Sequence, residues 1–209
     1  MFGRQGSGKG TQGKYFADRY HLTPFVMGDE LRKLATEDSE LGKKVKSIIE
    51  AGHLVSDDVV MEIIENFING LKPGTNVMFD GIPRKIGQAE KFDALMEKNH
   101  RNTKGVILNI SEETAIRRLT SRRMCSQCKA IFPANYDKLF CKTCGGTLES
   151  REDDSNMDSI RNRLNAFNNE TMPVIERYRK EGKLIELNGE PDIDQVNTEA
   201  FPKLDPFFL

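Results

Sequence analysis

The chain has 209 residues, and its 31 Lys and Arg against 32 Asp and Glu give a formal net charge of -1 at pH 7. At about 150 residues per domain, this length allows one large domain or one core that carries small insertions. The balanced charge argues against a protein that holds nucleic acid by bulk charge. No apolar run approaches the roughly 20 residues of a membrane helix, and no secretory signal opens the chain. We therefore expect a soluble, cytoplasmic protein without a membrane partner.

Short apolar runs alternate with stretches of helical periodicity along the whole chain. In chain order, the predicted elements are a strand stump at 1–2, helix 11–20, strand 23–27, helix 41–49, helix 59–68, strand 76–80, helix 88–98, strand 105–110, a helix capped by Ser111 that runs to about 123, helix 158–181 and strand 184–187. Pro173 lacks a backbone donor, so we expect a kink or break in the last helix. The alternation predicts βαβ units and a parallel sheet, which is the α/β class.

A glycine-rich loop opens the first predicted helix, where residues 3–11 read GRQGSGKGT. Its glycines let successive N–H groups point at one anion, and the helix that follows adds its N-terminal dipole. Lys9 can then bridge the β- and γ-phosphates of a nucleotide. The usual pattern has Ser or Thr directly after the lysine, whereas here Gly10 intervenes and Thr11 follows. The loop predicts phosphate binding by Gly6, Ser7, Gly8, Lys9, Gly10 and Thr11.

Four cysteines are confined to one short segment, as two Cys-x2-Cys pairs separated by 12 residues: Cys125, Cys128, Cys141 and Cys144. Cytosolic chains rarely keep disulfides, and two such pairs place four sulfurs around one tetrahedral metal ion. Four thiolates leave no open coordination position, so the metal is expected to be structural. Zinc is the expected ion, and iron could occupy the same site.

The glycine loop also resembles that of the adenylate kinase family of nucleoside monophosphate kinases. Further motifs of that family follow in the family's order, namely GDELR at 28–32, GHLVSD at 52–57, DGIPR at 80–84, Gln88, the arginines at 118, 122, 123 and 151, Asp153, Asp154, and RNRL at 161–164. The resemblance covers nearly the whole chain. It implies a three-layer P-loop core with a parallel sheet (1–25, 56–120 and 155–209), a helical insertion that binds the monophosphate (26–55) and a zinc-ribbon lid (121–154).

The resemblance implies reversible transfer of the terminal phosphoryl group from ATP to AMP, giving two ADP, with Mg²⁺ and a structural Zn²⁺. It also implies a monomer whose partners are these small nucleotides and not nucleic acid. Such a transfer brings several negative charges together, and planar guanidinium groups suit their neutralisation. The catalytic residues implied are Lys9, Arg84, Arg118, Arg122, Arg151 and Arg163.

The same resemblance assigns the remaining contacts residue by residue. ATP would be held by the glycine loop from Gly6 to Thr11 and by Arg118, Arg122, Ile131 and Phe132. AMP would be held by Met27, Arg32, His53, Leu54, Val55, Gly81, Ile82, Pro83, Arg84, Gln88, Arg151 and Arg163. Asp80 would hold Mg²⁺ through water, while Asp153 and Asp154 would brace the arginines of the lid.

Two departures from the family pattern keep other interpretations open. The family has several apolar residues before the first glycine of the loop, which form a central strand, whereas here only Met1 and Phe2 precede Gly3. Either the start lies upstream, or most of that strand is lacking, in which case the chain could be a poorly folded fragment. Met27 stands where the family has Thr or Ser, so UMP, CMP or GMP is an alternative acceptor. A further alternative is a zinc ribbon that binds nucleic acid, with a glycine loop that no longer binds a nucleotide. The arginines at 117, 118, 122 and 123 support this alternative.

Overall fold

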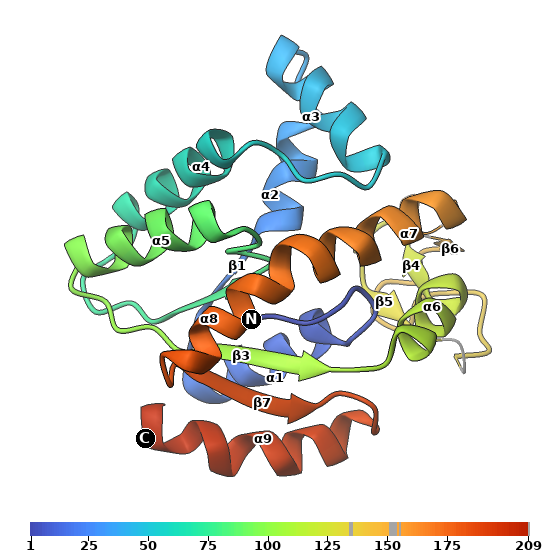
Figure 1. The fold of residues 1–209 in the computed structure, drawn as a ribbon. Helices are drawn as coiled ribbons and strands as arrows, with labels where there is room; N and C mark the ends of the chain where they lie inside the picture. Colours follow the sequence, from blue (N-terminus) through green and yellow to red (C-terminus); the bar gives the residue numbers. More distant parts are fainter. Residues whose placement is uncertain (134–135, 151–153, 155, 209) are drawn as a thin grey trace.

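The chain folds around parallel strands covered by helices, as the sequence predicts (Figure 1). The computed structural model describes residues 1–133, 136–150, 154 and 156–208. Strand β1 (Thr23–Val26) pairs in parallel with β2 (Val77–Asp80), and β3 (Gly105–Asn109) pairs in parallel with β7 (Leu184–Asn188). Parallel pairs need crossover connections, and the helices between these strands supply them. The α/β class predicted from the sequence is therefore confirmed.

Residues 1 and 2 lie between the two strand pairs. The Phe2 N–H donates to the Val106 carbonyl at 2.7 Å, the Leu108 N–H donates to the Phe2 carbonyl at 3.0 Å, and Phe2 forms a parallel bridge with Ile107. On the other side, the amino group of Met1 donates to the carbonyl of Phe79 in β2. An open cavity of about 1750 Å³ continues from this point, and residues of both β2 and β3 line it.

The helices are α1 (Lys9–Tyr20), α2 (Met27–Leu34), α3 (Glu40–Glu50), α4 (Asp57–Asn69), α5 (Ile86–Lys98), α6 (Glu112–Ser121), α7 (Met157–Ala166), α8 (Met172–Lys180) and α9 (Ile193–Phe208). The break expected near Pro173 is present, because a π-helical turn, Phe167–Thr171, separates α7 from α8. Helix α2 has no counterpart among the elements predicted from periodicity, which end a strand at Met27, and neither has helix α9. Helix α9 forms despite Pro202 and Pro206, and its buried face packs into the same apolar cluster as α1 and β7.

Two parts stand out from the strand pairs and their covering helices. Helices α2 and α3 project together at the top of Figure 1. At another edge, β4 (Arg123–Cys125), β5 (Ile131–Phe132) and β6 (Leu148–Ser150) form an antiparallel sheet with β4 in the middle. These parts fall within the segments for which the sequence predicts a monophosphate-binding insertion and a lid, and that functional division stays a prediction. In the part of the chain that the structure describes, no helix combines the length and apolarity needed to cross a membrane.

An apolar segment fused ahead of Met1 is expected to raise the melting temperature by several degrees. A strand in the cavity would be buried on both faces and would form ladder bonds to β2 and β3. It would also replace the amino group of Met1, whose pKa burial lowers to about 6, by an uncharged amide. Thermal unfolding of the chain with a Val-Ile-Val-Leu prefix measures the effect.

The control for this prediction is a Gly-Ser-Gly-Ser prefix of the same length, which offers backbone but no apolar side chains. We expect it to leave the melting temperature close to that of the original chain. Equal melting temperatures for the two prefixed chains would show that the cavity does not accept a strand.

Candidate functional site

The glycine loop leads from Phe2 to the first turn of α1 with a backbone that side chains would obstruct. Gly8 is the residue before α1 and has a φ of 93°, which a residue with a side chain rarely adopts. A Cβ at Gly6 would lie 2.9 Å from the Ala115 carbonyl oxygen. The residue before α1 supplies no side-chain cap. The first N–H groups of the helix therefore face the loop, an arrangement that favours an anion.

Lys9 is folded back over this loop. Its Nζ donates to the Gly3 carbonyl at 2.7 Å and to the Arg4 carbonyl at 3.1 Å. Burial lowers the pKa of Lys9 to about 8, the negative charge of Asp80 opposes that shift, and nearby guanidinium groups add to it. The guanidinium groups in question are those of Arg84, Arg122 and Arg163. The structure thus brings three of the predicted catalytic arginines within electrostatic reach of Lys9.

Asp80 ends β2 and is buried beside this cluster. Its Oδ1 has no hydrogen-bond partner among the residues that the structure describes, and the same holds for the buried Oγ of Ser7 in the loop. A buried carboxylate oxygen without a partner is costly in a folded protein. Because carboxylate and hydroxyl oxygens are suitable ligands for a hard cation or its water shell, this pair fits Mg²⁺.

The arginines of this region are held by carbonyl and carboxylate oxygens. Asp154 is buried and accepts from two of them, from Arg163 Nη1 at its Oδ1 (2.7 Å) and from Arg122 Nε at its Oδ2. This is the bracing role expected for Asp154. Arg118 donates to the carbonyls of Gly189 and Glu190, both at 2.9 Å, from the last turn of α6. Arg151 and Asp153 lie outside the described residues.

The DGIPR segment connects β2 to α5 and turns back on itself. Gly81 has a φ of 82°, and the Arg84 Nε donates to the Gly81 carbonyl at 2.8 Å, so the guanidinium lies over the glycine. The Ile82–Pro83 peptide bond is cis, and both side chains are buried. Gln88 follows on α5, where its Oε1 accepts from the Arg84 backbone N–H at 2.9 Å.

Asp57 is a residue of this region whose contacts the sequence did not predict. It begins α4, and its Oδ1 accepts from Gln88 Nε2 at 2.9 Å. In the sequence it reads as an acidic residue in a first helical turn, a common stabilising position. Asp57 and Gln88 are 31 residues apart in the sequence, so their contact produces no periodic pattern. The only sequence signal for Asp57 is its position as the last residue of the GHLVSD motif.

The remaining predicted acceptor residues divide into a surface set and a core set. His53 and Leu54 line a cavity of about 360 Å³ together with Lys85 of the α5 N-terminus and residues of α7. Arg32 is half exposed and pairs with Asp29. Val55 and Met27 are buried in one apolar cluster with Ile82, so the Met27 side chain serves the core at this position.

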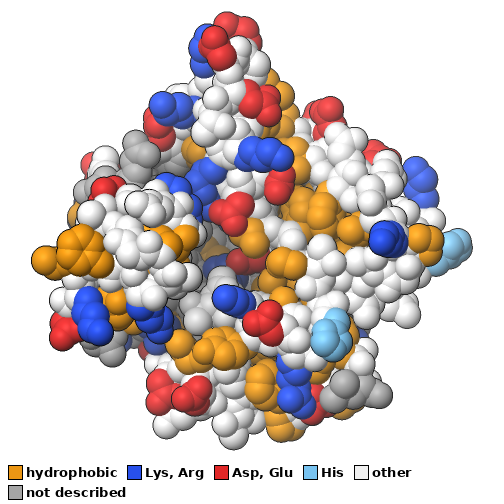
Figure 2. Space-filling view, turned by 180° about the vertical axis from the view of Figure 1, so that it is seen from behind, with side chains coloured by type: hydrophobic (Ala, Val, Ile, Leu, Met, Phe, Trp, Pro, Cys, Tyr) orange, Lys and Arg blue, Asp and Glu red, His pale blue; other side chains and the backbone are white. Residues whose placement is uncertain are grey.

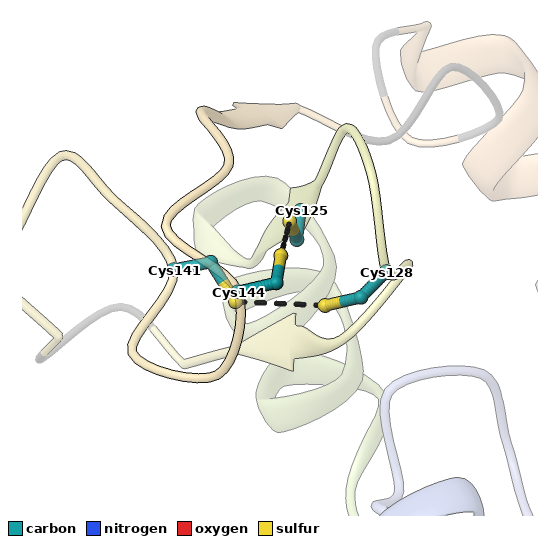
Figure 3. A group of neighbouring side chains, drawn as sticks. All are labelled: Cys125, Cys128, Cys141 and Cys144. Carbon is teal, nitrogen blue, oxygen red and sulfur yellow. Dashed lines mark hydrogen bonds between the residues drawn. The ribbon is translucent and has the colours of Figure 1, made fainter.

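The four cysteines meet at the centre of the small antiparallel sheet region (Figure 3). Their sulfur atoms all lie within 4.8 Å of one another, with 3.4 Å between those of Cys125 and Cys144 and 3.5 Å between those of Cys128 and Cys141. A tetrahedral site with metal–sulfur bonds of about 2.3 Å places its sulfurs about 3.8 Å apart. The group could therefore hold a metal ion.

The two predicted lid contacts to ATP, Ile131 and Phe132, form β5. Ile131 is exposed, whereas Phe132 is buried against Cys125 and Cys141 and packs on Tyr136 with ring centroids 4.5 Å apart. Adjacent residues of a strand point to opposite faces. Ile131 therefore lies on the solvent-exposed face of the small sheet, and Phe132 lies on the face that packs against Cys125 and Cys141.

Comparisons with known proteins agree with this geometry. The family model described as adenylate kinase matches residues 1–183. The adenylate kinase of Methanocella arvoryzae is 35% identical, over 96% of this chain and 94% of its own. That of Paramagnetospirillum magneticum is 36% identical, over 94% of this chain and 93% of its own. That of Kosmotoga olearia is also 36% identical, over 98% of this chain and 97% of its own. On its loop, its charged cluster and these matches, the chain belongs to the adenylate kinase family.

Proposed function

We propose that the glycine loop, Asp80 and the arginines around Lys9 carry out the reaction of this family, reversible transfer of the terminal phosphoryl group from ATP to AMP. The observation that carries the proposal is the crowding of positive charge at the loop. Lys9 is half-buried, and three guanidinium groups lie close enough to lower its pKa. Such a group of cations is stabilised by several phosphate charges, which the two substrates supply together.

Each group at the loop has a part in the transfer. The backbone N–H groups of the loop and of the first turn of α1 bind the phosphates of ATP, and Lys9 exchanges its two carbonyl partners for phosphate oxygens. Arg118, Arg122 and Arg163, with Arg151, neutralise the charge that spreads over the transferred group. Asp80 would hold Mg²⁺ through water, and the bound ion would supply further positive charge to the phosphates.

The acceptor occupies the side bordered by α2, the segment 53–55 and the DGIPR turn. Arg32 and Arg84 hold its phosphate, Gln88 contacts the base, and the segment from His53 to Val55 lines the site. The side chain of Met27 lies in the apolar cluster and offers the base only a weak acceptor. AMP is the proposed acceptor, and UMP, CMP or GMP is the alternative that this methionine keeps open.

The distribution of charge on the face shown in Figure 2 gives little support to the nucleic-acid alternative. On the face shown in Figure 2, Lys and Arg side chains are interspersed with Asp and Glu and do not gather into one patch. Binding to a phosphate backbone depends on such a patch or stripe. The arginines that supported this alternative include Arg122, which is paired with the buried Asp154. The proposed partners remain the small nucleotides ATP and AMP. The proposed oligomeric state is a monomer.

The cysteine group is proposed to hold a structural zinc ion. The four sulfurs lie within 4.8 Å of one another, close enough to share one ion, and a shell of four thiolates would leave no position at which water could be activated. Apart from the cysteines, the apolar cluster here comprises, among the described residues, only Phe132 and three partly buried residues. Metal binding would therefore contribute folding free energy to the segment directly. Residues 26–55 and 121–154 are the parts proposed to close over the nucleotides.

The proposal is tested by initial rates with ATP and each of AMP, UMP, CMP and GMP, for the original chain and for Lys9→Met. We expect AMP to give the highest kcat/KM. The Lys9→Met variant should lose about two to three orders of magnitude in kcat, as when a preorganised transition-state donor is removed. It should keep its circular dichroism spectrum, because the half-buried ammonium that it loses is costly to the fold.

Lys14→Met is the matched control for this variant, because Lys14 lies on the same helix with an exposed side chain. Its activity should equal that of the original chain. A Lys9→Met variant with nearly full activity would remove the proposed role of the loop, and a higher rate with another monophosphate would replace AMP as the acceptor.

Affinity for ATP should weaken as the pH rises above about 8. Lys9 must be protonated to bind phosphate, and its pKa in the free protein is about 8 because of burial. Bound phosphate raises that pKa, so below pH 8 the affinity is constant with respect to this group. Above it, binding takes up one proton and the affinity falls by up to about tenfold per pH unit. Calorimetric titration from pH 7 to pH 10 measures this dependence.

The Lys9→Met variant again serves as the control for the pH series. Its binding should be weaker throughout and should lack the decline that begins near pH 8. An identical decline in both proteins would assign the titration to another group.

Removal of the metal should lower the melting temperature and leave measurable transfer at low temperature. The ion orders the lid without taking part in chemistry, so its loss loosens a closing segment and keeps the reacting groups. Metal analysis should give about one zinc per chain by the four-thiolate stoichiometry. Cys125→Ser with Cys128→Ser should reproduce the chelated protein. Complete loss of activity at low temperature with intact circular dichroism would indicate a catalytic metal.

A further inference from the structure

We propose that Asp57 is a positioning residue that fixes the orientation of the Gln88 amide and thereby sets which purine base the acceptor site prefers. The inference rests on the proposed function, in which Gln88 faces the acceptor base. It concerns a contact between two helices, since Asp57 is the first residue of α4 and Gln88 the third residue of α5.

The Gln88 amide is held at both of its ends by partners of opposite kind. Its Oε1 accepts from the Arg84 backbone N–H at 2.9 Å, and its Nε2 donates to Asp57 Oδ1 at 2.9 Å. A backbone N–H can only donate, and an ionised carboxylate can only accept. A flipped amide would therefore place donor against donor at Arg84 and acceptor against acceptor at Asp57. With the Gln88 side chain 2% exposed, water cannot readily relieve either contact.

The position of the Asp57 carboxylate is itself determined by the two helices. Its Oδ1 lies 3.7 Å from Lys85 Nζ, and a Cβ at Gly87 would lie only 3.4 Å from its Oδ2. The carboxylate thus sits against the first turn of α5 while it begins α4, near the positive ends of both helix dipoles. Its side chain is 30% exposed, so solvent screens this attraction only in part.

Because the Gln88 amide cannot flip, its oxygen and its nitrogen each keep one fixed position with respect to a bound base. A glutamine amide has two donor hydrogens and two acceptor lone pairs, and the two bonds described use one of each. Adenine offers its 6-amino group as a donor beside ring nitrogens that accept, an edge that a glutamine amide matches with two hydrogen bonds. A 6-oxo purine has an acceptor at position 6 and a donor at position 1. It would match only an amide that has flipped.

The test compares AMP with inosine monophosphate as acceptors at saturating ATP, in the original chain and in Asp57→Ala. We expect Asp57→Ala to lower the AMP preference in kcat/KM by about tenfold, within the range that one bidentate base contact contributes. The change should come mainly from KM for AMP, with KM for ATP unchanged. Asp57→Asn, which keeps the size of the side chain, should give an intermediate ratio because its amide can itself flip.

Two further variants separate orientation from a general effect on the fold. Asp58→Ala removes the neighbouring carboxylate from the same first turn, and that carboxylate is 90% exposed and pairs with Lys91 at 2.9 Å, so the ratio should not change. In a Gln88→Ala background, adding Asp57→Ala should change the ratio no further. An unchanged ratio in Asp57→Ala and Asp57→Asn, or an equal fall in the Gln88→Ala background, would overturn the inference. Failure of the proposed function would instead appear in the original chain, as absence of transfer to AMP.

Discussion

The half-buried charge of Lys9 is the constraint on which the rest of the site depends. An ammonium removed from water loses several kcal/mol of solvation unless partners replace it, and here two loop carbonyls and the nearby Asp80 do so. Arg84, Arg122 and Arg163 add three positive charges to the same region, while Asp154 adds one negative charge. Four cations therefore face two carboxylates among the described residues. In the proposed function, the phosphate groups of the bound nucleotides would balance this excess of positive charge.

The strands bring these charges together from four segments that lie far apart in the sequence, namely the loop at Lys9, the DGIPR segment, the end of α6 and α7. Asp80 stands at the carboxyl end of β2, and the loop follows residues that bridge β3. Ligand sites of open parallel sheets lie at the carboxyl ends of their strands, where the turns to the next helices meet. Arg118 and Arg122 come from the end of α6, which follows β3, and Arg163 comes from α7. The geometry of the cluster thus follows from the packing of the strands and of α6 and α7.

The sequence predicted most of this fold because the relevant signals are local. Glycines, the lysine and the following helix identify the loop, and apolar periodicity places the strands within one or two residues of their observed bounds. Helix α9 escaped prediction because Pro202 and Pro206 argue against a helix, whereas burial of Val196, Ala200 and Leu204 stabilises one. The contact between Asp57 and Gln88 escaped it for a different reason. It depends on how closely two helix N-termini approach, which no local pattern records.

The cysteine group and the ion pair between Arg122 and Asp154 are connected through the strands of the small antiparallel sheet. Arg122 immediately precedes β4, the central strand of the small sheet, whose third residue is Cys125. The paired strand β6 ends at Ser150, four residues before Asp154, and Asp154 is the carboxylate that pairs with Arg122. In the sequence, one partner of this buried ion pair therefore precedes β4 and the other follows β6. Disorder at the cysteines would loosen the pairing of β4 with β6 and thus the position of Arg122. A structural metal can in this way set the precision of a charge cluster while it contributes nothing to the chemistry itself.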